Sequence, residues 1–152
     1  MTKQAGQTET PGIFDTHAHY DDEAFDSDRE ALLGQMESAG IKRIVNVSSS
    51  LATTRSTAAL AARYSFIYGT AGVHPDEVGE LNEESFAWLR EAAQGGKIAA
   101  IGEIGLDYHW NVEEKEVQKK WFVRQLKLAE ELGLPAVIHS REAAQDTLEI
   151  IK

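Results

Sequence analysis

Segments with strand character and segments with helical character alternate five times along this 152-residue chain, and this alternation constrains the fold more than any other feature. Repeated alternation of this kind is typical of a parallel sheet whose strands are joined by helices. Ser27 and Glu30 have the spacing of a capping box at the start of the first helix. The predicted strands span residues 14–19, 41–47, 66–73, 97–102 and 136–139. The predicted helices span residues 27–40, 51–64, 83–93, 113–132 and 142–152.

Residues that can bind metal fall at or just beyond the ends of the predicted strands. They are His17, His19, His74, Glu103 and His139. The carboxyl ends of parallel strands meet at one edge, where barrels and open α/β sheets gather their sites. Chance placement of all of them at strand ends would be rare. We therefore expect these side chains to converge.

The stretch FDTHAH, residues 14–19, is the first part of this pattern. Alternate residues of a strand face the same side, so Asp15, His17 and His19 share a face and two imidazoles can reach one metal. The chain has no cysteine, which leaves imidazole and carboxylate as metal ligands. An isolated His-x-His also fits a second interpretation, in which one histidine lies on the surface and the other is packed.

A carboxylate can bridge two cations, so Glu103 is the candidate that would join the histidines into one site. Two metals that share a water and clamp the oxygens of a displacement perform hydrolysis. Arg141 lies two residues beyond His139 and shares its strand face, so its planar guanidinium would reach the mouth of the site. There it can hold a phosphate or a carboxylate.

Other residues in these segments have a structural interpretation. His74 can bond to the backbone of the turn that follows it, which is an alternative to a role in the site. Asp107 and His109 are expected in a loop. Trp121 and Phe122 lie on a helix with regular apolar spacing and are expected in the core.

Composition limits the classes of function. The chain is 42% hydrophobic and 26% charged, which is normal for one globular domain, expected over residues 12–152 after a flexible lead over residues 1–11. The net charge of −10 argues against non-specific coating of duplex DNA, although divalent metals can still attract a phosphate to an acidic site. No apolar run approaches bilayer length and the first ten residues are polar, so we expect a cytoplasmic protein without membrane contact.

Five segments of the chain carry distinctive motifs. They are FDTHAHYDD (14–22), AGVHPDEV (71–78), IGEIGLDYHW (101–110), QKKWFVRQLKLAEELGLP (118–135) and AVIHSREA (136–143). Together these segments resemble the TatD family of metal-dependent deoxyribonucleases, within the wider group of amidohydrolase-like barrel hydrolases. The GEIGLDY and IHSR motifs are a much sharper signal than His-x-His, and the resemblance covers nearly everything from Ile13 to the C-terminus.

The resemblance implies a parallel (β/α) TIM barrel with a centre of two divalent metal ions, Mg, Mn or Zn, acting on DNA. It implies that His17 and His19 bind one metal, that the catalytic Glu103 bridges both, and that His139 binds the second. It also implies that His74 and Arg141 lie near the substrate phosphate.

The chain departs from the family pattern in its length. A family barrel has about 250 residues, and its further strands supply another histidine and an aspartate that cannot be located here. We therefore expect a barrel truncated after about five βα units, with little nuclease activity and with exposed edges that permit self-association. Two alternatives remain, namely a hydrolase of a small amide or ester and an inactive fragment that acts only in assembly.

Overall fold

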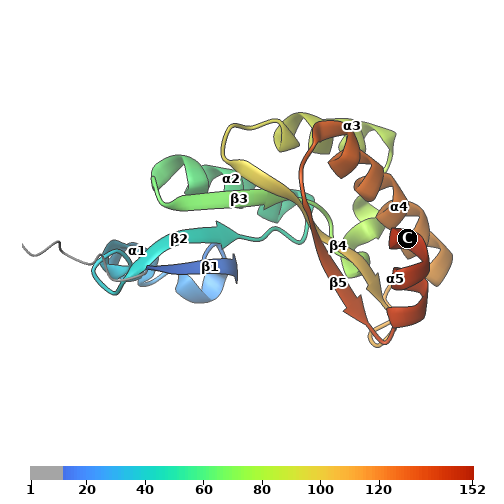
Figure 1. Ribbon diagram of the computed structural model, residues 1–152, viewed down its shortest axis with the longest axis horizontal. Coiled ribbons are helices and arrows are strands. Elements are labelled where there is room, and N and C mark those ends of the chain that lie inside the picture. The colour runs from blue at the N-terminus through green and yellow to red at the C-terminus, as the bar shows by residue number, and fades with distance from the viewer. Residues whose placement is uncertain (1–11) are drawn as a thin grey trace, which may run out of the picture.

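One parallel sheet runs through the part of the chain that the structure describes. In the computed structural model, which describes residues 12–152, five strands form a sheet in the order β1-β2-β3-β4-β5 (Figure 1). Each neighbouring pair is parallel, so the predicted α/β architecture is confirmed. The lead expected over residues 1–11 lies outside the described residues. The strands are β1 (Ile13–Ala18), β2 (Ile41–Asn46), β3 (Ile67–Ala71), β4 (Ile98–Asp107) and β5 (Ala136–Arg141).

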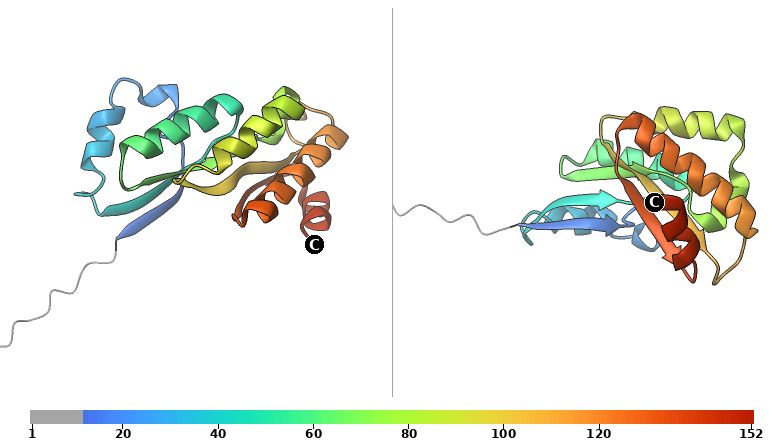
Figure 2. Two further views of the ribbon diagram at one scale, coloured as in Figure 1. Left: turned by 90° about the horizontal axis from the view of Figure 1, so that it is seen from above. Right: turned by 45° about the vertical axis from the view of Figure 1, so that its right-hand side comes forward.

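Helices follow the strands and leave one face of the curled sheet bare. Because the strand order advances by one each time, right-handed crossovers place the connecting helices on the same side. Figure 2 shows α2, α3 and α4 together on that side. No helix within residues 12–152 combines the length and the hydrophobicity needed to cross a bilayer. The helices are α1 (Arg29–Gln35), α2 (Leu51–Arg63), α3 (Glu83–Ala93), α4 (Lys115–Leu132) and α5 (Ala144–Ile151), with short 3-10 helices η1 (Glu23–Phe25) and η2 (Pro75–Glu80).

Two clusters of apolar side chains fill the space between the sheet and these helices. The smaller cluster joins Leu33 of α1, Ile44 of β2 and Leu60 of α2. The larger cluster lies among β3, β4, α3 and α4. It includes Trp121 and Phe122, which are 4% and 1% exposed, so their predicted place in the core is confirmed.

Two buried glutamines of α4 bond to the backbone at the ends of β3 and β4. The Gln125 amide accepts a hydrogen bond from Val73 N at 2.9 Å and donates one to Val73 O at 3.0 Å. The Gln118 amide accepts from Asp107 N at 2.9 Å and donates to Asp107 O at 3.0 Å. Both glutamines are fully buried. The helix therefore supplies hydrogen bonds to backbone groups at the carboxyl edge of the sheet, where polar groups would otherwise be unpaired.

Strand β4 extends beyond its predicted end at residue 102. It continues to Asp107, because residues 104–107 pair with β5 and Asp107 lies opposite Arg141. A local sequence pattern cannot reveal pairing with a strand so far along the chain. The prediction that Asp107 is a loop residue is therefore wrong. The register of β4 against β5 shifts between Ile101 and Ile104, a stretch that contains Gly102.

The predicted capping box at Ser27 and Glu30 is also wrong. Helix α1 begins after Asp28, whose side chain makes no capping hydrogen bond. A capping box forms instead at the start of α2, where Ser50 and Thr53 bond to each other's backbone N–H groups. The acidic connection before α1 folds as the turn η1 and moves the start of the helix past Ser27.

Replacement of Gln125 by leucine should lower the free energy of unfolding by about 1–3 kcal/mol, because it leaves the buried N–H and C=O of Val73 unpaired. Urea denaturation would measure the change. The matched control is Gln145→Leu, since the Gln145 side chain is exposed and bonds only to Glu149. Equal stability of the two variants would contradict the role assigned to Gln125.

Candidate metal centre

The two histidines of the first motif lie together at the end of β1. Their ring centroids are 5.0 Å apart, and the pairing of β1 with β2 is irregular between Asp15 and Ala18. The Nδ1 atom of His19 lies 2.8 Å from the carbonyl oxygen of Val47. A carbonyl only accepts hydrogen bonds, so Nδ1 carries the proton and a neutral His19 presents the lone pair of Nε2. That orientation suits a metal ligand.

Glu103 lies between this histidine pair and the histidine of β5. One carboxylate oxygen, Oε2, is 3.5 Å from His17 Nε2, and the other, Oε1, is 3.2 Å from His139 Nδ1. The Glu103 side chain is only 16% exposed. The two carboxylate oxygens therefore face opposite sides. A carboxylate that bridges two cations requires this arrangement.

Buried hydroxyl groups hold the backbone beside Glu103. The hydroxyl groups of Ser48 and Thr70 donate hydrogen bonds to the carbonyl oxygen of Gly102, and both side chains are fully buried. The N–H of Glu103 donates to Ser48 O at 2.7 Å. Neither residue was predicted from the sequence, because isolated hydroxyl residues in apolar strands carry no distinctive spacing.

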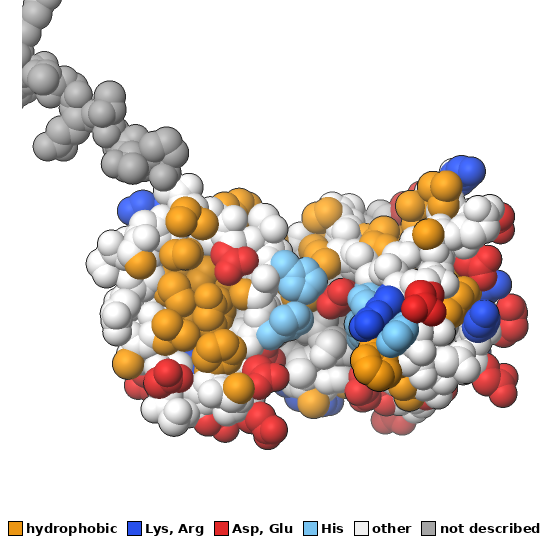
Figure 3. Space-filling view, turned by 90° about the horizontal axis from the view of Figure 1, so that it is seen from below, with side chains coloured by type: hydrophobic (Ala, Val, Ile, Leu, Met, Phe, Trp, Pro, Cys, Tyr) orange, Lys and Arg blue, Asp and Glu red, His pale blue; other side chains and the backbone are white. Residues whose placement is uncertain are grey.

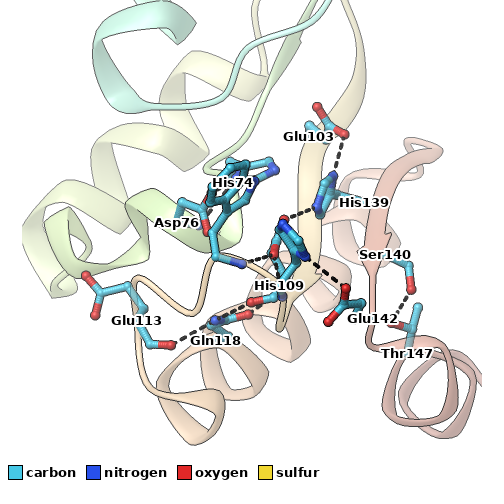
Figure 4. A network of polar contacts seen from close by, with 12 residues as sticks. His74, Asp76, Glu103, His109, Glu113, Gln118, His139, Ser140, Glu142 and Thr147 are labelled. Atoms are coloured by element: carbon cyan, nitrogen blue, oxygen red, sulfur yellow. Dashed lines mark hydrogen bonds and ion pairs between the residues drawn. The ribbon is translucent and has the colours of Figure 1, made fainter.

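His139 is held on its far side by Asp107, the last residue of β4. The two residues are joined by a 2.8 Å contact between His139 Nε2 and Asp107 Oδ2, while Nδ1 faces Glu103 (Figure 4). Asp107 is 1% exposed and also accepts hydrogen bonds from the N–H groups of His109 and Trp110. Burial by itself raises the pKa of Asp107, but the hydrogen bonds from Trp110, His139 and His109 outweigh it and lower the pKa. Asp107 is therefore an ionised acceptor that orients the His139 ring.

The sequence contained a signal for Asp107. Glu103, Gly105 and Asp107 alternate along one strand, so continuing the strand would have placed Asp107 on the same face as Glu103. His109, by contrast, lies in the turn after β4 as predicted. Its Nδ1 is 2.8 Å from Glu142 Oε1, away from the carboxylate of Glu103 (Figure 4).

His74 both caps the following turn and faces the site. Its Nδ1 accepts a hydrogen bond from Asp76 N at 3.3 Å at the start of η2, as the structural alternative predicted. Its ring centroid is also 4.2 Å from that of His139. Burial, and next the neighbouring His139, lower the pKa of His74. A neutral ring that accepts through Nδ1 carries its proton on Nε2.

Arg141 is the last residue of β5 and its side chain is exposed. Its guanidinium carbon lies 5.3 Å from the ring centroid of Trp110. The backbone oxygen of Arg141 accepts from Tyr108 N at 2.9 Å, which continues the contact between β4 and β5 past the strand ends. Trp110 is therefore an aromatic neighbour of Arg141, a contact that was not predicted from the sequence.

The potential ligand atoms form overlapping groups. Within residues 12–152, one group is His17, His19 and Glu103, and another is His74, Glu103 and His139, with atoms within 4.8 Å of one another in each. Glu103 belongs to both groups. Imidazole nitrogen and carboxylate oxygen are suitable donors for divalent transition metals, so these residues fit a metal centre.

The site opens onto the bare face of the sheet. Figure 3 shows histidine side chains in two neighbouring groups across this face, with acidic side chains beside them. A cavity of about 350 Å³ adjoins the histidines. Its lining residues are His19, Asp21, Asp22, Ser49, Thr53, His74 and Glu103.

The chain is similar to proteins of one family. Residues 14–152 match the family described as TatD related DNase. The chain is 39% identical over 140 residues to the uncharacterized metal-dependent hydrolase YabD of Bacillus subtilis, and the match covers 92% of this chain and 55% of the relative. It is 37% identical over 131 residues to the 3'-5' ssDNA/RNA exonuclease TatD of Cronobacter sakazakii, covering 86% and 50% of the two chains.

The chain is also similar to solved structures of TatD proteins. The crystal structure of YjjV, a TatD homolog from Escherichia coli, has a TM-score of 0.82 and 32% identity, covering 90% of this chain and 54% of that one. The hydrolase TatD family protein from Entamoeba histolytica has a TM-score of 0.84 at 24% identity, which supports the fold. The chain spans about half the length of the curated relatives it matches. On the match over residues 14–152, the chain belongs to the TatD related DNase family.

Proposed function

We propose that this protein is a metal-dependent hydrolase of TatD type that cleaves phosphodiester bonds in DNA. The observation that carries the proposal is the Glu103 carboxylate, whose two oxygens face His17 and His139 from opposite sides. Family membership supports a hydrolytic role for such a centre, and one relative is named a 3'-5' ssDNA/RNA exonuclease.

In this proposal, His17 and His19 would hold one divalent metal, His139 would hold a second, and Glu103 would contribute to both positions. The ions would be Mg, Mn or Zn. When bound, such metals supply Lewis acidity and an activated water, which together suit attack on a phosphodiester. The hydrogen bond from His19 to Val47 O and the contact of His139 with Asp107 support these roles, because each fixes a ring orientation.

The remaining residues would act on the substrate directly. His74 is suited to donate a hydrogen bond to a phosphate oxygen through Nε2, since its Nδ1 already accepts from Asp76 N. A neutral ring keeps that proton at neutral pH, consistent with the lowered pKa of His74. Arg141 would hold the phosphate with two parallel N–H donors.

Cleavage of a 5'-labelled single-stranded oligonucleotide with Mn²⁺ or Mg²⁺ tests this function. Because the chain spans about half the length of its relatives, the assay has two arms, one with the chain alone and one with an added polypeptide covering strands six to eight of a related barrel. We expect little cleavage by the chain alone and metal-dependent cleavage in the second arm. Absence of cleavage in both arms, or hydrolysis of a lactone or dipeptide instead, would contradict the proposal.

Glu103→Gln should reduce the content of both metals, because the amide loses the charge that would neutralise two cations. His139→Ala should reduce mainly one of them. Elemental analysis after dialysis against Mn²⁺ or Zn²⁺ measures the bound metal per chain. Equal losses in the two variants would contradict the bridging role of Glu103.

Arg141→Lys keeps the charge but loses the planar fork, so in the active arm it should lower kcat/KM for the oligonucleotide by the equivalent of about 1–3 kcal/mol. Arg55→Lys is the matched control, since Arg55 lies over Trp88 on the helical side of the molecule. Unchanged turnover in Arg141→Lys would remove this residue from the substrate site.

The chain should also associate with a second copy of itself. Strands β1 and β5 are the edges of the sheet, and Ile13, Phe14 and Ile138 on them are 56%, 57% and 39% exposed. Unpaired edges with apolar side chains favour strand pairing between chains.

Light scattering should therefore show a mass that rises with protein concentration. Phe14→Lys should shift the equilibrium toward the monomer, whereas Val112→Lys, at a position 62% exposed and away from the edges, should not. A constant monomer mass at all concentrations would contradict this proposal.

A further inference from the structure

Trp110 is an exposed indole beside the candidate metal centre. The side chain is 61% exposed, whereas Trp121 is 4% exposed and Trp88 packs against the larger core cluster. An indole that lies largely in water contributes little to the core and is well suited to contact a ligand. The core therefore does not account for the position of Trp110.

A guanidinium group and an imidazole ring lie against the indole of Trp110. The Arg141 guanidinium carbon is 5.3 Å from its ring centroid, and the His109 ring packs edge-on with its centroid 4.8 Å away. In Figure 3, basic and hydrophobic side chains adjoin one group of histidines on the bare face. The guanidinium lies over one face of the indole, which leaves the opposite face as the surface on which a base could stack, with a phosphate-binding group close by.

The backbone N–H of Trp110 is held at a fixed position relative to His139. The same carboxylate of Asp107 accepts a hydrogen bond from Trp110 N at 3.0 Å and contacts His139 Nε2 at 2.8 Å. Asp107 is itself fixed through its backbone by Gln118. The turn that carries the indole is therefore positioned beside the candidate metal centre before any ligand binds.

We propose that Trp110 is a stacking platform for an unpaired nucleobase of single-stranded DNA or RNA, with the adjacent phosphate held at Arg141. This inference rests on the proposed function and assigns a base-binding residue to the same site. Bases in a duplex are already stacked on both faces, so only an unpaired base can lie on the indole. Every base has a π face, and binding should therefore tolerate base identity.

The charge of the chain strengthens this inference. With a net charge of −10, the protein gains little from general attraction to phosphates. Stacking provides affinity that does not depend on counterion release. The binding of single strands should consequently depend on the bases as well as on the backbone.

The test compares a fluorescein-labelled ten-nucleotide oligothymidylate with an abasic oligonucleotide of equal length, by fluorescence anisotropy in EDTA so that no cleavage occurs. The unmodified chain should bind the oligothymidylate about ten-fold more tightly than the abasic strand, the scale of one base stacked on an aromatic ring. Trp110→Ala should bring the ratio close to one. Trp110→Phe should restore most of it, and Val112→Ala, at an exposed position in the same loop, should leave it unchanged.

Three further arms define the ligand. Oligouridylate separates RNA from DNA as the source of the base, and a duplex of the same length should bind more weakly than the single strand. Titration of unlabelled oligothymidylate should quench tryptophan fluorescence in the unmodified chain but not in Trp110→Phe.

Equal affinity for the normal and abasic strands, binding of neither, or an unchanged ratio in Trp110→Ala would overturn the inference. Retained base discrimination without metal-dependent cleavage would overturn the proposed function alone. Cleavage without base discrimination would overturn the stacking site alone.

Discussion

The buried carboxylate of Asp107 links the core, the candidate metal centre and the exposed aromatic turn. Its backbone bonds to Gln118 of α4, one carboxylate oxygen contacts His139, and the other accepts from Trp110 N. An ionised carboxylate that is 1% exposed is costly unless it is hydrogen-bonded, and here both of its oxygens have partners in His109, Trp110 and His139. The same contacts that make its burial possible therefore orient His139 and fix the turn that carries Trp110.

Close approach of β4 to β5 makes this arrangement possible. Gly105 has φ +148°, and a Cβ there would lie 1.9 Å from the carbonyl oxygen of His139. Any side chain at this position would push β5 away, together with the histidine that faces Glu103. The register shift beside Gly102 belongs to the same stretch, where the backbone bonds to Ser48 and Thr70. Backbone geometry and site geometry are thus determined by the same few residues.

The sequence predicted the fold class and the strands well, because alternation of strand and helix is a local pattern repeated along the chain. It also predicted that His17, His19, His74, His139 and Glu103 lie close together, since the ends of parallel strands meet at one edge. The sequence did not predict features that depend on contacts between distant residues. Strand β4 continues to Asp107 because β5 pairs with it, and the buried Gln125 bonds to the backbone of Val73. The turn η1 likewise moved the start of α1 past Ser27.

We propose that Glu103 joins two metal positions, one with His17 and His19 and the other with His139. Diffraction at the manganese absorption edge from crystals soaked in Mn²⁺ would locate these positions. We expect anomalous density on both sides of the Glu103 carboxylate, one peak toward His17 and His19 and one toward His139. Density only at sites remote from Glu103, or no bound metal among these residues, would contradict it.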